Sequence, residues 1–81
     1  MPEALLLDQL TSILRDVFDN DDVVATPELT AKKVDGWDSL GNVRLFIEIE
    51  RVFSIRFSAM ETTSLKNVGE LAALIEKKRN G

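Results

Sequence analysis

WDSLGNVRLFIEIERVF, residues 37–53, contains the pattern that organises this 81-residue chain. From Ser39 to Phe53 the apolar residues recur at helical spacing and cover most of the circumference of the predicted helix. Its polar remainder is a narrow stripe of Gly41, Arg44, Glu48 and Arg51. Because a helix that is apolar on most sides packs against several neighbours, we expect this one at the centre of a helical bundle.

On the N-terminal side of this segment, an apolar stripe predicts an amphipathic helix over about residues 3–18. The connection over residues 19–37 contains Pro27, Gly36 and many polar residues, and it is predicted to be mostly loop. Four apolar residues are expected to pin this loop to the core: Val23, Val24, Leu29 and Val34.

On the C-terminal side, the sequence predicts a short extended piece at residues 55–57 and one or two helical turns near residues 59–63. A final helix follows, with Asn67 as its N-cap and Glu70 as the partner in a capping box. The expected fold is all-α: a single domain over residues 1–81, built as a small antiparallel four-helix bundle with three main helices, one short helix and a long first loop.

Composition restricts the function. The chain has no cysteine and no histidine, so it has no disulfide, no thiolate metal site, no thiol nucleophile and no imidazole base. Residues 1–38 hold nine acids and three bases, giving −6, whereas residues 39–81 hold five acids and seven bases, giving +2. This acidic first half argues against a nucleic-acid partner. With no signal-peptide pattern and no apolar run of the ~20 residues that a membrane span needs, we expect a cytoplasmic monomer.

Asp38 and Ser39 lie where the central helix begins. Either side chain is a good N-cap, because its oxygen can accept a hydrogen bond from a free N–H of the first turn. The same helix end, with its positive dipole, also favours a phosphate ester on a serine. Without a base beside it, Ser39 is a poor catalytic nucleophile, so we expect no catalytic residue in this chain. It could still accept a group attached by another protein.

GWDSLGNVRLFIEIERVFSIRF, residues 36–57, resembles the carrier helix of acyl carrier proteins, with the motif at Asp38, Ser39 and Leu40. The resemblance extends over almost the whole chain, because the helix order and the long loop also match. It implies a free-standing carrier with 4′-phosphopantetheine, donated from coenzyme A, esterified to Ser39 by a phosphopantetheinyl transferase. The arm would bring the thiol that the chain lacks, and acyl groups would be carried on it as thioesters.

Loading and transfer enzymes are the partners that the resemblance implies. The expected docking surface comprises Trp37, Gly41, Arg44, Glu48 and Arg51. Carriers of fatty-acid synthesis typically have acidic residues after the motif, whereas the charges between residues 39 and 53 cancel here. Since mismatched charge excludes partners, we predict a dedicated carrier of a specialised pathway, for a lipid, a polyketide or a related product. The alternative is the housekeeping carrier of fatty-acid synthesis.

Six apolar residues have two interpretations: Val43, Ile47, Phe57, Met60, Leu65 and Leu71. Most are expected to belong to the core. The resemblance also implies that the gap between the second and third helices can admit an acyl chain, which these residues would line. The bulk of Phe46, Phe53 and Phe57 predicts that any pocket is small, and that the cargo is short, polar or mostly exposed.

Two further functions can be weighed against the carrier. An unmodified helical interaction module would use the same docking surface, and for it the substitution Ser39→Ala would remove only a cap. A calcium loop at Asp19–Asp22 is rejected, because Val23 and Val24 occupy the positions where an EF-hand needs its third ligand and its glycine. Trp37 is expected to pack the loop onto the bundle, close enough to Ser39 to touch an arm.

Overall fold

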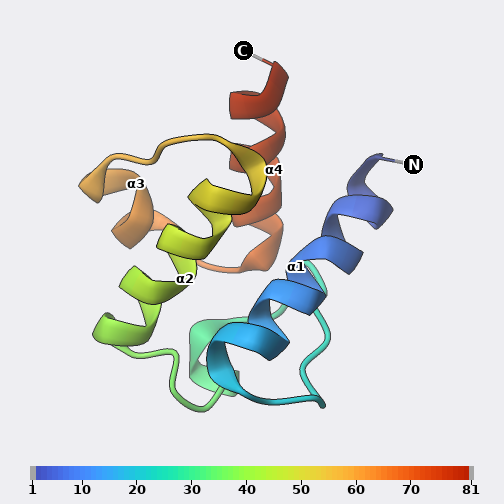
Figure 1. Cartoon of the computed structure of the whole chain (residues 1–81), viewed down its shortest axis with the longest axis vertical. Coiled ribbons are helices and arrows are strands. Elements are labelled where there is room, and N and C mark those ends of the chain that lie inside the picture. The colour runs from blue at the N-terminus through green and yellow to red at the C-terminus, as the bar shows by residue number, and fades with distance from the viewer. Residues whose placement is uncertain (1, 81) are drawn as a thin grey trace.

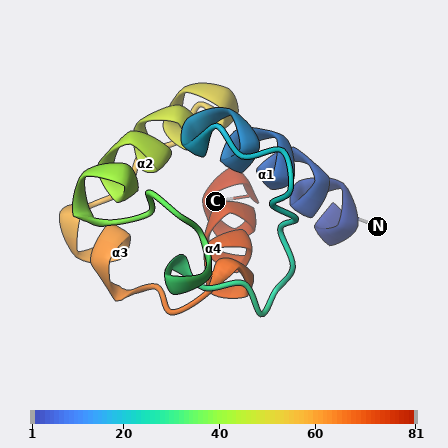
Figure 2. The same ribbon diagram turned by 90° about the horizontal axis from the view of Figure 1, so that it is seen from below.

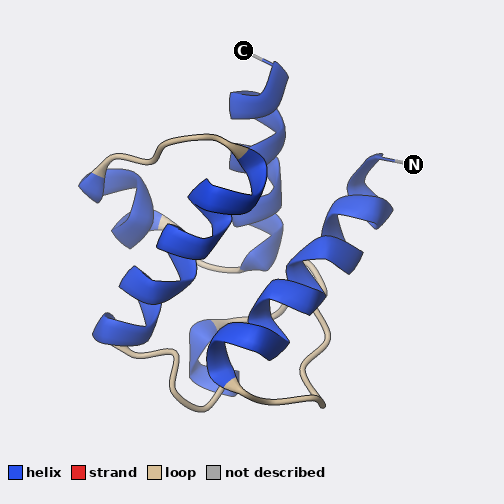
Figure 3. Cartoon of the chain, in the orientation of Figure 1, coloured by secondary structure: helices blue, strands red, loops and turns tan. Residues whose placement is uncertain are grey.

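The computed structural model describes residues 2–80, in which it has four α-helices and one 3₁₀ turn (Figures 1 and 3). The elements are α1 (Pro2–Phe18), η1 (Ala31–Lys33), α2 (Ser39–Phe53), α3 (Ala59–Ser64) and α4 (Val68–Asn80). The predicted all-α bundle is confirmed, and the bounds of α2 are those predicted from its apolar pattern. The turn η1 within the first loop was not predicted.

The helices form a bundle in which α1 runs in the opposite direction to α2 and α4, so that both ends of the chain lie at the same end of the molecule (Figure 1). Helix α1 packs against α2 and α4, and α3 packs against α2. Viewed from below, the long loop crosses the end of the bundle between α1 and α2 (Figure 2). No helix in residues 2–80 is long and apolar enough to cross a bilayer.

One hydrophobic core joins the three long helices and the loop. Its buried residues are Leu6, Leu10, Ile13, Leu14, Val23, Ala25, Val34, Leu45, Phe46, Ile49, Val68, Leu71, Ala72 and Ile75. Each long helix contributes residues three or four positions apart, as an amphipathic helix packed on one side requires. The first and last of these helices together supply eight of the fourteen buried residues.

The long loop is fixed by hydrogen bonds to α1 and to α4. The Thr11 hydroxyl of α1 accepts a hydrogen bond from the Ala25 N–H at 2.9 Å. At the start of α4, the Val68 and Gly69 N–H groups each donate to a carbonyl of this loop, at 2.9 Å. Val23 and Val34 are buried as predicted, but Val24 is 55% exposed, so its prediction as an anchor was wrong. Backbone pairing thus adds to the apolar contacts that hold this loop.

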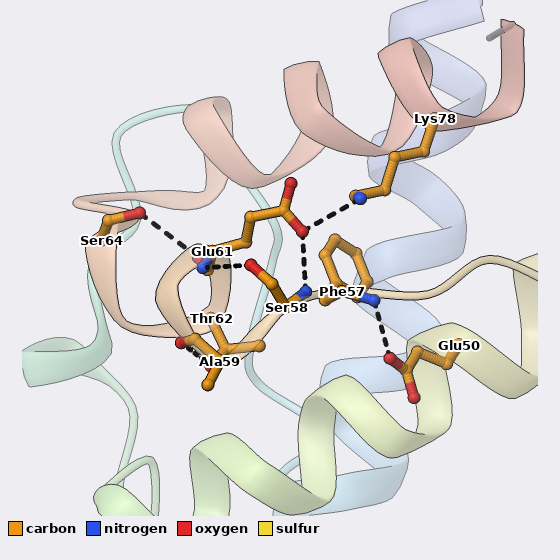
Figure 4. Close-up of polar contacts among 8 residues, drawn as sticks. All are labelled: Glu50, Phe57, Ser58, Ala59, Glu61, Thr62, Ser64 and Lys78. Carbon is orange, nitrogen blue, oxygen red and sulfur yellow. Dashed lines mark hydrogen bonds and ion pairs between the residues drawn. The ribbon is translucent and has the colours of Figure 1, made fainter.

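Helix α3 is held by polar contacts rather than by buried side chains (Figure 4). Ser58 and Glu61 form a capping box, with the Ser58 hydroxyl accepting from the Glu61 N–H at 3.1 Å and the Glu61 carboxylate from the Ser58 N–H at 2.8 Å. Glu61 also pairs with Lys78 of α4 at 3.0 Å. The Glu50 carboxylate of α2 accepts from the Phe57 N–H at 2.8 Å. Ser58 is therefore the N-cap of this helix.

The cap of α4 was predicted in part correctly. The Asn67 side chain accepts from the Glu70 N–H at 2.9 Å, as expected of an N-cap. Glu70, however, accepts from the N–H of Lys66 and not from that of Asn67. The last turn of α4 carries the basic residues Lys77, Lys78 and Arg79. The Lys78 Nζ atom lies 5.4 Å from the centroid of the Phe57 ring, so this lysine also packs against an aromatic side chain.

Candidate functional site

The start of α2 assigns different roles to its first two polar residues. Asp38 is the N-cap, and its side chain accepts a hydrogen bond from the Gly41 N–H at 2.9 Å. Ser39 is the first helical residue, and its side chain is exposed. Since Asp38 satisfies the capping requirement, the Ser39 hydroxyl is left accessible at the positive end of a 15-residue helix. The explanation of Ser39 as a structural cap is therefore wrong.

The residue before this cap packs the loop onto the bundle, as predicted. The Trp37 ring stacks on Phe18 of α1, with ring centroids 5.7 Å apart. Its indole Nε1–H donates to the Asn42 side-chain oxygen at 2.9 Å. The Asn42 amide nitrogen donates in turn to the backbone carbonyl of Thr62 in α3 at 3.0 Å. Loop, α2 and α3 are thus joined one turn beyond Ser39.

Two spaces adjoin this hydrogen-bonded bridge. An open groove of about 350 Å³ contains Ser39 and Asp38 in its wall. A more enclosed cavity of about 60 Å³ is lined in its apolar part by Phe46, Leu65 and Leu71. The walls of both include Trp37, Asn42, Thr62 and Leu65. The accessible serine therefore lies in a groove that shares a wall with a small, more enclosed cavity.

The charged side chains on the exposed face of α2 have partners within the chain. Arg44 donates to the carbonyl of Val17, near the end of α1, at 3.2 Å. Arg51 forms an ion pair with Glu48, and this hydrogen-bonded pairing lowers the pKa of the Glu48 carboxyl. Among the predicted docking residues, Arg44 and Arg51 are exposed, whereas Glu48 and Trp37 are half-buried.

Gly41 does not lie on this face, so its placement in the docking surface was wrong. It is buried, and a Cβ atom at this position would lie 2.0 Å from the Gly36 carbonyl oxygen and 2.8 Å from the Phe18 ring. The sequence pattern showed that residue 41 lies outside the apolar part of the helix, but it could not show that α1 and the loop come close there. Gly41 serves the packing of the helix start.

The six candidate pocket residues are divided by the fold. Leu71 is buried, Phe57 and Leu65 are half-buried, and Leu65 and Leu71 line the internal cavity. Val43, Ile47 and Met60 are 54%, 60% and 80% exposed, so their interpretation as core residues was wrong. Leu40 of the motif is 70% exposed and lies on α2 with Val43 and Ile47. Exposed large apolar side chains of this kind are typical of interaction surfaces.

Asn42 and Thr62 were missed by sequence reasoning, although both line the groove and the cavity. A signal was present for Asn42, since an amide one turn after Ser39 interrupts an otherwise apolar side of the helix. None was present for Thr62, because it contributes its backbone carbonyl to the bridge and any residue type supplies one.

The chemistry available at this site is that of an acceptor. Ser39 offers an accessible hydroxyl, and the chain contains no histidine to act as its base. Within residues 2–80 no cluster of three or more potential metal-ligating side chains occurs. The arrangement can hold a group that another protein attaches, with a groove beside it.

Comparison with known proteins identifies the family. No protein-family model matches the chain, and no curated protein sequence matches it either. Among solved structures, the solution structure of the holo acyl carrier protein from Geobacter metallireducens matches with a TM-score of 0.85 at 46% sequence identity, over 96% of this chain and 86% of that one. With this identity, coverage and fold, the chain belongs to the acyl carrier protein family, whose members are carriers and not enzymes.

Proposed function

We propose that this chain carries acyl intermediates as thioesters on a 4′-phosphopantetheine arm attached to Ser39. The observation that carries the proposal is the division of roles at the start of α2, where Asp38 caps the helix and Ser39 stays exposed. Similarity to a holo acyl carrier protein supports the same cofactor in this chain. Asp38 and Leu40 complete the attachment motif.

The residues around Ser39 fit such an arm. A phosphodiester on the Ser39 oxygen would lie at the N-terminus of α2, where the helix dipole favours a negative charge by about 0.3–1 kcal/mol. From there the groove lined by Trp37, Asn42 and Thr62 offers both an apolar ring and hydrogen-bonding groups. When attached, the arm supplies the thiol that this cysteine-free chain lacks.

A phosphopantetheinyl transferase would perform the attachment. The Ser39 hydroxyl loses its proton, and its oxygen forms a bond to the pantetheine-side phosphorus of coenzyme A. The pyrophosphate bond breaks, and the nucleotide leaves with the other phosphate. This chain contributes an accessible hydroxyl and the motif around it, and the transferase supplies the base.

The cargo that fits is small. The enclosed cavity has about 60 Å³, and one water-sized group needs roughly 10–15 Å³ of such volume, so it holds about four to six of them. Phe46 of α2 packs edge-to-face against Phe57, just before α3, with ring centroids 4.8 Å apart, and this bulk favours a small cargo. A short acyl group would be sheltered, and a longer one would stay largely in the open groove.

Partner enzymes would dock on the outer face of α2. Leu40, Val43 and Ile47 supply exposed apolar area there, and Met60 of α3 is also exposed. Arg44, Glu48 and Arg51 lie on the side of α2 that faces α1, whereas the Glu50 carboxylate accepts from the Phe57 N–H. The exposed charges thus favour partners less basic than those of a carrier with an acidic helix, which supports a specialised-pathway carrier over a housekeeping one.

Intact mass tests the attachment. The purified chain is incubated with coenzyme A and a broad-specificity phosphopantetheinyl transferase, beside a Ser39→Ala control. We expect a mass gain of one phosphopantetheine in the parent chain and none in the control. A folded chain that gains no mass with several transferases would instead favour an unmodified interaction module.

A further inference from the structure

Asn42 connects three parts of the molecule at the point where an attached group would leave the surface. Its side-chain oxygen accepts from Trp37 of the loop at 2.9 Å, and its amide nitrogen donates to the Thr62 carbonyl of α3 at 3.0 Å. Both contacts come from one amide on α2, so the Asn42 side chain closes a bridge from loop to α3. The bridge is part of the wall shared by the open groove and the enclosed cavity.

The two spaces differ in character on either side of this bridge. Ser39 and Asp38 lie on the groove side and are exposed. Phe46 and Leu71 lie on the cavity side and are buried. For an acyl group anchored through Ser39, the direct route from the groove to the apolar cavity therefore passes the Asn42 amide.

The bridge is suited to opening. Its two hydrogen bonds join uncharged, partly exposed groups, and such bonds contribute little net stability because water can replace them. One of them ends on α3, a helix of six residues with no buried side chain. A displacement of α3 away from α2 would lengthen the Asn42–Thr62 contact before any core contact is lost.

We propose that Asn42 is a specificity-determining residue that limits the length of the acyl group this chain shelters. With the bridge closed, the cavity accepts only a short acyl group, and a longer chain must break the bridge to enter. The proposal rests on the proposed attachment at Ser39. A purely structural fastener would lower stability when removed but would not change how protection depends on acyl length.

The experiment compares acyl lengths on variants of this residue. Acetyl, butyryl, hexanoyl and octanoyl groups are loaded on Ser39 by transferring the acyl-phosphopantetheine from each acyl-coenzyme A. Asn42→Ala breaks both hydrogen bonds, and Trp37→Phe keeps a ring on Phe18 but removes one donor. Thr62→Ala is the matched control, because it shortens a side chain in the same wall and keeps the carbonyl that Asn42 binds.

Two measurements report entry into the cavity: the methyl resonances of Leu65 and Leu71, and the rate at which hydroxylamine cleaves the thioester. In the parent chain and in Thr62→Ala we expect resonance shifts with the two short groups only. In Asn42→Ala we expect the hexanoyl and octanoyl groups to shift these resonances, and their cleavage to become several-fold slower. Trp37→Phe should lie between the two.

The outcomes separate this inference from the proposed function. A chain that gains no arm by mass contradicts the proposed function and this inference together. If the chain carries the phosphopantetheine arm, but the resonance shifts and cleavage rates depend on acyl length in the same way in Asn42→Ala as in the parent, only the role of Asn42 is overturned. In the unmodified chain, the Trp37 indole N–H should exchange with solvent more slowly than in Asn42→Ala, and equal exchange rates would show that the bridge is absent.

Discussion

At the scale of single residues, Asp38 and Ser39 separate two tasks that the sequence leaves combined. Asp38→Ala should destabilise the fold by about 1 kcal/mol, because the Gly41 N–H loses its acceptor. Ser39→Ala should cost far less, since Ser39 supplies no cap. Urea unfolding of both variants measures the two free energies.

Asp38→Asn is the control for this comparison, because its side-chain oxygen still accepts a hydrogen bond and should retain most of the stability. An equal loss from Ser39→Ala and Asp38→Ala would contradict the division of roles at the start of α2.

Gly41 is required by close packing rather than by backbone flexibility. Replacing it with alanine improves helix propensity by about 1 kcal/mol, yet the added Cβ would lie 2.0 Å from a backbone oxygen of the loop. We expect Gly41→Ala to lower the free energy of unfolding by about 1–3 kcal/mol, as overpacking does. Thermal unfolding measures this change in stability. The variant Ala73→Gly, at an exposed position of α4, measures how much the difference in helix propensity alone contributes. A more stable Gly41→Ala would show that the loop is not packed as described.

Residue type alone could not have located the hydrogen-bonded bridge through Asn42 or the exposed apolar residues of α2. Val43 and Ile47 have the same helical spacing as core residues, and a pattern does not distinguish a face that packs within the chain from one that binds a partner. Asn42 was visible as an interruption of that pattern, but its partners come from the loop and from α3, which only the fold brings together. Asp38 and Ser39 could be placed because capping preferences are local.

At the scale of elements, the shortest helix depends on one carboxylate. The pKa of Glu61 is lowered from 4.5, first by the hydrogen bond from the Ser58 N–H and then by that from Lys78. A pKa lower in the folded than in the unfolded chain means that the carboxylate stabilises the fold above about pH 4.5. This stabilisation is lost as the pH falls through the lower, folded-state pKa.

Glu61→Gln should therefore be less stable than the parent near neutral pH, and the difference should disappear in acid. Urea unfolding across the range from neutral to acidic pH measures this difference. The Glu48 carboxyl also has a lowered pKa, so both chains are compared in a Glu48→Gln background that removes its contribution. A difference that persists unchanged in acid would contradict the role of the Glu61 charge.

The long helices were predictable and the contacts of the short one were not. Periodicity located α1, α2 and α4 to within one or two residues, because a buried stripe recurs every three or four positions. Helix α3 has no such stripe, and its position was estimated from small polar residues. Its capping box at Ser58 and Glu61 was readable in principle from the local pattern, but its ion pair with Lys78 joins residues far apart in the chain.

At the scale of the whole molecule, we propose that charge on the outer face of α2 selects the partners. Arg44→Glu should speed acyl transfer by enzymes of fatty-acid synthesis with basic docking surfaces, because attraction replaces repulsion at first encounter. We expect a gain of several-fold at low ionic strength that fades near 0.15 M salt, where charges are screened beyond about 8 Å. Initial transfer rates at several salt concentrations measure it.

Arg44→Gln is the matched control, since it also loses the charged contact to the Val17 carbonyl but adds no negative charge. If Arg44→Glu is no faster than Arg44→Gln, partner selection does not depend on this charge, and the proposal of a specialised carrier loses its main support.

The stacking of Trp37 on Phe18 has a practical consequence. Trp37 is the only tryptophan, and the chain has no tyrosine, so the ultraviolet emission of the protein comes almost entirely from one indole. That ring lies in the wall of both the groove and the cavity, within two residues of the exposed serine. The molecule thus contains its own fluorophore at the place where cargo would arrive, and loading could be followed in real time without any attached label.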